Sequence, residues 1–263
     1  MRLAIVFHGI IGGTAGRNGL GDPVDIETCA KTIKHNVISR YDTDVFLHSW
    51  SIEHEQAIKD LYNPISALFE PQEYFGYNFS DDTIKDENKT HAFRTVSRYN
   101  SLYRAIQLKK EHEKLNNFKY DWVLVLRYDL VMFTPLELEK LDRSGFYICR
   151  EPYWPNIHSL QMLHDIVFLS NSELIDTYCD VTTGLNMAPY SSRLHEAHRI
   201  AYLKLHDMFK GNMNRIGYAF DRYKDMEIYR MIIDPSQSPT GHMYGGNETK
   251  TRLEKLLEEI NGT

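Results

Sequence analysis

Two opposite charges follow a short apolar run near the middle of the chain, at a spacing that suits chemistry on a phosphate-bearing ligand. The run is Val-Leu-Val-Leu at residues 123–126, and Arg127 and Asp129 come after it. An apolar run of this length with β-branched residues predicts a strand buried on both faces of a parallel sheet, although a buried helix could carry the same run. Ligands of open α/β sheets lie beyond the carboxyl ends of the strands, so Asp129 is placed to reach a metal ion or a phosphate. The alternative is an ion pair that caps the strand.

A glycine-rich segment follows the first predicted strand, which covers residues 2–8. Six of the thirteen residues from 9 to 21 are glycine. Glycine lets the backbone approach a ligand closely, so we expect the segment from His8 onward, including Gly9, Gly12 and Gly13, to contact a nucleotide. The spacing matches neither the dinucleotide fingerprint nor the P-loop, and a plain flexible loop is the alternative.

Residues 91–115 have the periodicity of an amphipathic helix, and two arginines lie near its start. Arg94 and Arg98 are four residues apart and therefore share one face of that helix. We expect Arg98 to bind an anion such as a diphosphate, with solvated surface arginines as the alternative.

The order of the other elements predicts the fold class. Residues 1–70 show the pattern strand, helix, strand, helix, strand, which is the front half of a doubly wound sheet. We expect Ser51 and Ser170 to cap the helices that follow them. Further strands are expected at residues 145–149, 164–170, 214–219 and 226–233, and further helices at residues 171–180, 193–209 and 250–260. The prediction is one α/β domain with a mostly parallel central sheet and helices on both faces.

Composition narrows the class of protein. The chain has 263 residues, of which 42% are hydrophobic and 25% charged, as in an ordinary globular protein. Its net charge of -6 argues against non-specific nucleic-acid binding. No apolar run approaches the length that spans a bilayer, and the apolar N-terminal stretch is short for a signal peptide. Three well-separated cysteines fit a reducing compartment, so we expect a cytoplasmic protein.

Four segments, taken in their order and spacing, resemble a group of sugar-nucleotide-dependent glycosyltransferases with a GT-A-type fold. That group occurs in bacterial capsule and lipopolysaccharide synthesis and in large DNA viruses. The segments are DVFLHSW at residues 44–50, LYNP at 61–64, SRYNSLYRAI at 97–106 and YDWVLVLRYDL at 120–130. The resemblance covers residues 1–170 and thins beyond them. It implies a single GT-A-like domain over residues 1–263, with a nucleotide-sugar half at 1–144 and an acceptor half at 145–263.

The resemblance also implies a metal site. Enzymes of this fold usually carry Asp-x-Asp at the end of the central strand, and the last carboxylate ligates a Mn²⁺ or Mg²⁺ ion that bridges the donor diphosphate. Here the motif is Arg127-Tyr128-Asp129, so Asp129 keeps the implied metal role and His242 is the implied second ligand. Arg127 stands where the pattern has the first carboxylate, and it could itself neutralise phosphate charge.

The implied reaction moves a sugar from a nucleoside-diphosphate donor, most often a UDP-sugar in this fold, to a hydroxyl of a glycan acceptor. If the transfer inverts the anomeric centre, a carboxylate must take the proton of that hydroxyl, and Asp165 and Glu196 are the candidates. Aromatic faces must hold the sugar, and we expect Trp50, Tyr153 and Trp154 to supply them.

Other classes of protein stay open at this point. A catalytically inactive nucleotide- or sugar-binding module with the same fold would also explain Arg127. The sequence His-Glu-Ala-His at residues 195–198 is one residue short of the zinc-protease spacing, which disfavours a zinc hydrolase. A nicotinamide-dependent oxidoreductase is disfavoured because the first loop lacks the dinucleotide spacing.

Overall fold

The computed structural model describes residues 1–11, 24–72, 86–150, 161–180, 196–230, 242–243 and 246–262. For residues 86–91, 230, 242–243 and 246–247 it describes the backbone alone. No helix in these ranges is long and apolar enough to cross a membrane.

A seven-stranded sheet forms the centre of the molecule. From edge to edge its order is β3 (Ser66–Phe69), β2 (Asp42–Ser49), β1 (Arg2–Gly9), β4 (Trp122–Arg127), β7 (Phe168–Ser170), β6 (Phe146–Arg150) and β8 (Ile216–Asp221). All neighbours pair in parallel except β7, which is antiparallel to both β4 and β6. The prediction of a mostly parallel α/β sheet is confirmed.

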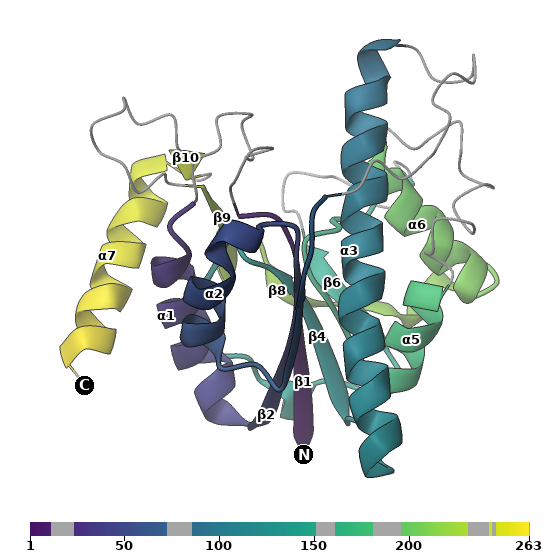
Figure 1. The fold of residues 1–263 in the computed structure, drawn as a ribbon, viewed down its shortest axis with the longest axis horizontal. Helices are drawn as coiled ribbons and strands as arrows, with labels where there is room; N and C mark the ends of the chain where they lie inside the picture. The colour runs from purple at the N-terminus through teal and green to yellow at the C-terminus, as the bar shows by residue number, and fades with distance from the viewer. Residues whose placement is uncertain are drawn as a thin grey trace.

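Helices cover both faces of this sheet (Figure 1). One face carries α3 (Asp86–Asn116), α5 (Ser172–Asp180) and α6 (Ala197–Met208), and the other carries α1 (Ile26–Asn36) and α2 (Glu55–Tyr62). The C-terminal α7 (Gly246–Gly262) packs on α1. Short 3-10 turns occur at Ile38–Arg40, Ile52–His54, Leu138–Lys140 and Met213–Arg215.

The central strands are apolar on both faces because each face has its own helical layer. Along β1, Ala4 and Val6 join the cluster under α3, whereas Leu3, Ile5 and Phe7 join the cluster under α1 and α2. This alternation follows from the two-residue period of a strand. The continuous apolar run of β4 is buried for the same reason, as predicted.

The chain turns at Tyr128 and Asp129 and leaves the large sheet. It then enters a three-stranded sheet of β5 (Leu130–Met132), β9 (Met226–Arg230) and β10 (His242–Met243). Strands β8 and β9 follow each other closely in sequence but belong to different sheets. The Asp129 carboxylate therefore lies where β4 ends and the two sheets part.

Two predicted helix caps are wrong because tertiary contacts use the hydroxyls. Ser51 makes no side-chain cap bond to the helical turn after it, and its Oγ accepts from the N–H of Ile11 at 3.1 Å. The Oγ of Ser170 donates to the carbonyl of Gly145 at 2.7 Å, and the side chain of Asn171 caps α5 instead.

Two element boundaries also differ from the prediction. The strand expected at residues 164–170 forms over Phe168–Ser170 alone, which leaves residues 164–167 outside the ladder. The long helix α3 begins at Asp86 rather than at residue 91.

A buried cluster of charges joins α3 to α5. The carboxylate of Glu113, 1% exposed, accepts bonds from Lys109 at 2.9 Å, Lys119 at 2.8 Å and the Ser172 hydroxyl at 2.6 Å. Lys109 also lies 2.7 Å from Asp176. Since a buried ion needs a partner, this cluster fixes how α5 packs against the C-terminal part of α3.

We expect Glu113→Ala to lower the free energy of unfolding by about 3–5 kcal/mol, because it leaves Lys109 buried with one of its two carboxylates gone. Denaturant unfolding followed by circular dichroism measures the change. The control is Lys140→Ala, which removes a pair with Glu137 whose side chains are 70% and 51% exposed, and should cost below about 1 kcal/mol. Equal costs for the two variants would contradict a stabilising role of the buried cluster.

Candidate functional site

Polar side chains line the carboxyl ends of three neighbouring strands. His8 of β1 stands in register with His48 of β2 and with Arg127 of β4. Residues in register on adjacent strands point to the same face, and this face is the one that α3 covers. The apolar core under α3 therefore gives way to a polar layer at the edge where ligands of open α/β sheets bind.

Arg127 and Asp129 form a two-bond pair in this layer. Nε of Arg127 donates to Oδ1 of Asp129 at 2.9 Å, and Nη2 donates to Oδ2 at 2.7 Å. The side chain of Asp129 is 1% exposed and that of Arg127 is 11% exposed. Both carboxylate oxygens of Asp129 therefore accept from the guanidinium, in the fork geometry that makes such pairs strong.

Asp165 is the second buried carboxylate of the layer and has two partners. Arg98 of α3 donates to its Oδ2, and Nδ1 of His198 on α6 lies 2.9 Å from its Oδ1. Arg98 and Asp165 were predicted as site residues for different reasons, and the fold brings them into contact. Burial acts to raise the pKa of Asp165, but Arg98, His198 and Arg127 outweigh it and hold the pKa well below its usual range.

His8 is a buried polar side chain whose two ring nitrogens both lack a bond to the described residues. It is 1% exposed, and neither ring nitrogen has a hydrogen-bond partner among the described residues. Burial lowers the pKa of His8 well below its usual value, and Arg98, Arg127 and His48 lower it further, with Asp165 acting in the other direction. A neutral imidazole with two unused nitrogens is unusual in a protein interior, where polar groups are generally bonded.

A third group of polar and charged side chains borders the polar layer on the side of the small sheet. His164 Nε2 lies 3.2 Å from Nη1 of Arg222, whose Nε donates to Glu227 of β9 at 3.2 Å. The ring centroid of His164 is 5.2 Å from that of His198, so this set adjoins the Asp165 group. Burial, followed by the nearby His198 and Arg222, lowers the pKa of His164 to about 3.

The start of the glycine-rich segment is fixed by a second buried chain of bonds. The Ser101 hydroxyl of α3 accepts from the N–H of Gly9 at 2.7 Å and lies 2.7 Å from His48 Nδ1. His48 Nε2 is 2.9 Å from Glu70, which also accepts from Arg104. These partners assign the proton of His48 to Nε2, so that Ser101 donates to Nδ1.

This chain has the members of a nucleophilic triad, namely a serine, a histidine and a carboxylate. Ser101 and His48 are both fully buried, and the serine oxygen already accepts the Gly9 amide. The arrangement therefore holds the end of β1 rather than exposing a nucleophile. No spacing in the sequence signals it, because its residues come from three separate elements.

The predicted substrate-binding residues fall into three groups. Gly9, at φ 112°, and the side chains of His8, Arg98 and Arg127 lie in or beside the polar layer. Trp50 is 5% exposed, donates from Nε1 to the Ser97 carbonyl at 3.3 Å and packs edge-on against His48, so little of its ring faces solvent. Outside the described residues lie Gly12, Gly13, Tyr153 and Trp154.

Glu196 and His242 end in different positions. Glu196 occupies the residue before α6, with a side chain 33% exposed and 3.9 Å from Arg199. The backbone of His242 pairs with Arg230 in the small sheet, and the structure describes only the backbone of this residue. His164, His198 and Arg222 were not predicted as site residues. The partners of the two histidines, Arg222 and Asp165, are far away in sequence.

The described residues do not match the donor set of a metal ion. No group of three or more His, Cys, Asp or Glu side chains gathers among them. Asp129, the implied ligand, has both oxygens bonded to Arg127. A cation at Asp129 would share the carboxylate with the guanidinium of Arg127. The metal assignment of Asp129 and His242 stays a prediction.

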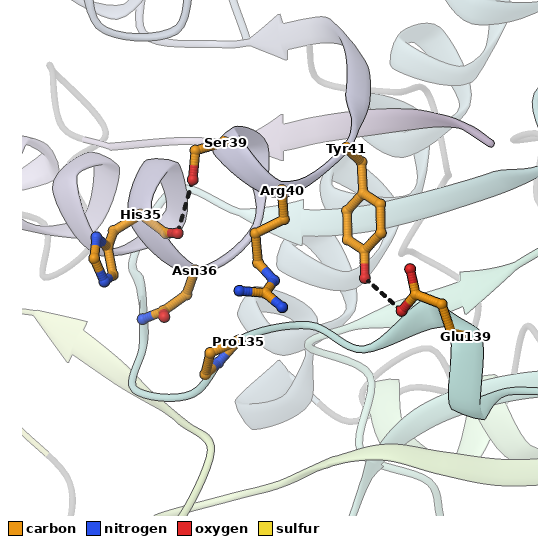
Figure 2. Close-up of a pocket in the computed structure, with 7 residues that line it drawn as sticks. All are labelled: His35, Asn36, Ser39, Arg40, Tyr41, Pro135 and Glu139. Atoms are coloured by element: carbon orange, nitrogen blue, oxygen red, sulfur yellow. Dashed lines mark hydrogen bonds between the residues drawn. The ribbon is translucent and has the colours of Figure 1, made fainter.

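A pocket forms at the opposite edge of the sheet, near the residue that precedes β2 (Figure 2). Tyr41 donates to the Leu136 carbonyl at 2.7 Å and points toward Glu139, and the Leu136 amide donates to the Asn36 carbonyl at 2.9 Å. These bonds tie the end of α1 to the segment after β5. The polar groups of the pocket thus serve the fold, and the pocket is separate from the polar layer.

Comparison with known proteins gives similarity of shape alone. Comparison with protein-family models and with curated proteins finds no match. Among solved structures, the apo form of the glycosyltransferase GlyE from Streptococcus pneumoniae TIGR4 is similar, with a TM-score of 0.40 and 16% sequence identity. The similarity covers 83% of this chain, which spans 45% of the GlyE chain.

We expect the free energy of unfolding to fall as the pH is lowered from about 6.5 toward 4. Burial lowers the pKa of His48 from 6.5 to about 4, with Glu70 opposing it, so the unfolded chain binds a proton that the folded protein refuses. Between those pH values the loss due to His48 is about 3 kcal/mol. Urea unfolding at a series of pH values measures it, and His48→Gln should flatten the curve.

His206→Gln is the matched control, because the His206 side chain is 47% exposed. Its pH dependence should equal that of the unsubstituted protein. An unchanged pH dependence in His48→Gln would show that His48 is not held neutral by burial.

Proposed function

We propose that this protein is a glycosyltransferase of GT-A type that moves a sugar from a nucleoside-diphosphate donor, with UDP as the expected nucleotide, to a hydroxyl of a glycan acceptor. The observation that carries the proposal is the polar layer at the carboxyl ends of β1 and β4. There His8, which has no bond to the described residues, is acted on by the charges of Arg98 and Arg127 and precedes Gly9 in the chain. Arginines and imidazoles at this edge suit a ligand with a diphosphate group.

The same layer offers a group to take the proton of the acceptor hydroxyl. Asp165 with its low pKa is a weak base on its own, but its Oδ1 lies 2.9 Å from Nδ1 of His198, whose side chain is 35% exposed. An aspartate next to Nδ1 of a histidine is the arrangement of serine-protease triads, where the histidine accepts the proton. We assign proton transfer to the Asp165–His198 pair, with Glu196 as the other carboxylate within the acceptor region.

The leaving diphosphate would be stabilised by hydrogen-bond donors already oriented toward it. Arg98 and Arg127 are held in place by Asp165 and Asp129, respectively, so neither guanidinium has to reorganise as charge develops. The division into a nucleotide-sugar half and an acceptor half, and the cytoplasmic location, stay predictions.

The first test is binding and turnover with a panel of donors. We expect UDP, or another nucleoside diphosphate of the panel, to raise the melting temperature, because a ligand of the native state stabilises it. Slow release of free sugar from the matching nucleotide sugar should follow, since water can replace the acceptor. Binding without any hydrolysis or transfer would instead support a catalytically inactive binding module, which the closed Arg127–Asp129 pair favours as the second candidate.

Asp165→Asn and His198→Gln should each reduce sugar transfer by about 10²–10⁴-fold, the usual worth of a general base. Nucleoside-diphosphate binding should persist in both, which titration calorimetry measures. Glu196→Gln is the matched control and should retain transfer. The opposite pattern, with Glu196→Gln inactive and Asp165→Asn active, would move the base to Glu196.

A further inference from the structure

We infer that Arg98, Arg127 and His8 hold the diphosphate of the donor by direct hydrogen bonds, and that no divalent cation is needed to bind it. The inference rests on the proposed function and names the groups that recognise the donor. It departs from the metal site that the resemblance implies, and it comes from how Asp129 is bonded.

Each oxygen of the Asp129 carboxylate accepts a bond from Arg127, at 2.9 and 2.7 Å, so a cation bound there would share the carboxylate with a guanidinium of like charge. The side chain of Asp129 is 1% exposed, so opening the pair would leave Arg127 and Asp129 to find new partners in a buried layer. The pair is therefore better suited to fixing a guanidinium than to receiving a cation.

The pair with Asp129 leaves N–H groups of Arg127 that a ligand can use. A guanidinium has five N–H groups, and Asp129 uses the one on Nε and one of the two on Nη2. Nη1 and the other Nη2 hydrogen are not used by Asp129. Arg98 is held in the same manner, because Asp165 accepts from its Nη1. Oriented guanidinium groups recognise phosphate oxygens by paired hydrogen bonds.

His8 is 1% exposed and has no partner for either nitrogen among the described residues. An unbonded buried polar group costs free energy, and a ligand that bonds to it recovers that cost. A Cβ added at Gly9, whose φ is 112°, would meet no described atom within 4 Å. Glycine at this φ leaves the approach open, where any other residue would be strained.

The charges around His8 also favour an anionic ligand. Arg98 and Arg127 are matched by Asp165 and Asp129, so these two ion pairs carry no net charge before a ligand binds. His8 is the neighbour that can add a positive charge. The groups that act on it are Arg98 of α3, Arg127 of β4, His48 of β2 and Asp165 before β7. An anion placed among them favours the protonated imidazole and so opposes the lowering of the His8 pKa by burial.

The test measures the dissociation constants of UDP, GDP and inorganic pyrophosphate by titration calorimetry, in EDTA and in MnCl₂. We expect at least one nucleoside diphosphate to bind with the same dissociation constant, within about twofold, in both conditions. Binding in MnCl₂ alone would overturn the inference while leaving the proposed function intact. Absence of binding by every nucleoside diphosphate in both conditions would overturn the proposed function and the inference together.

Variants separate the two models by the sign of the change. Arg127→Met should weaken nucleotide binding by about tenfold or more in EDTA and in MnCl₂, because it removes a charge-assisted donor. If Asp129 were a metal ligand, the same substitution would release its carboxylate, and binding in MnCl₂ would strengthen instead. His8→Asn, which does not disturb the Arg127–Asp129 pair, should weaken binding about tenfold in EDTA, since it shortens the group that reaches the ligand.

Arg94→Met is the matched control, because Arg94 is an exposed arginine one turn before Arg98 on α3. It should bind nucleotide as the unsubstituted protein does. Melting curves establish that each variant is folded. A folded His8→Asn that binds with unchanged affinity would remove His8 from the site and overturn the inference.

Discussion

Charges buried at the carboxyl edge of the central sheet must be paired, and this requirement organises the polar layer. Each of three arginines has its own carboxylate: Arg127 has Asp129, Arg98 has Asp165, and Arg222 has Glu227. The Arg98–Asp165 and Arg222–Glu227 pairs also fix one segment against another, whereas Arg127 and Asp129 belong to one turn. The layer is consequently neutral as a whole but rich in oriented donors, which is the property that a phosphate site needs.

The same requirement governs the first loop. Gly9 ends β1 with a positive φ, and its amide is bonded to Ser101 of α3. The chain of bonds continues through His48 to Glu70, so β1, β2, α3 and the end of β3 meet at one buried point. A loop that starts from a fixed point can contain many glycines and still begin in a defined direction.

The fold was largely predictable because its signals are local. The apolar run of residues 123–126 predicted the central strand, and Asp25, which bonds to the amide of Thr28, marks the start of α1. The caps assigned to Ser51 and Ser170 failed for the opposite reason, since distant backbone groups compete for those hydroxyls. Sequence spacing contains no information on such contacts.

The candidate site was predictable in its members but not in their pairing. Arg98, Asp165, Arg127 and Asp129 could be chosen by residue type and position at element ends. That Arg98 would meet Asp165, across 67 positions of sequence, depends on how α3 lies over the sheet. His198 and His164 gave no signal, because a histidine near a helix start or a strand start is common. The closed bonding of Asp129 was visible in the sequence as an alternative, since arginine and aspartate stand two residues apart.

The reversed direction of β7 has a consequence for how such a site can diversify. A strand that runs against its neighbours begins at the edge where they finish, so the residues just ahead of β7, His164 and Asp165, reach that edge without a long excursion of the chain. The parallel strands thus place their carboxyl ends at this edge of the sheet, and β7 places its amino end there. Substitutions in the segment before β7 can then change one side of the site, while the other side, built from β1 and β4, keeps its shape.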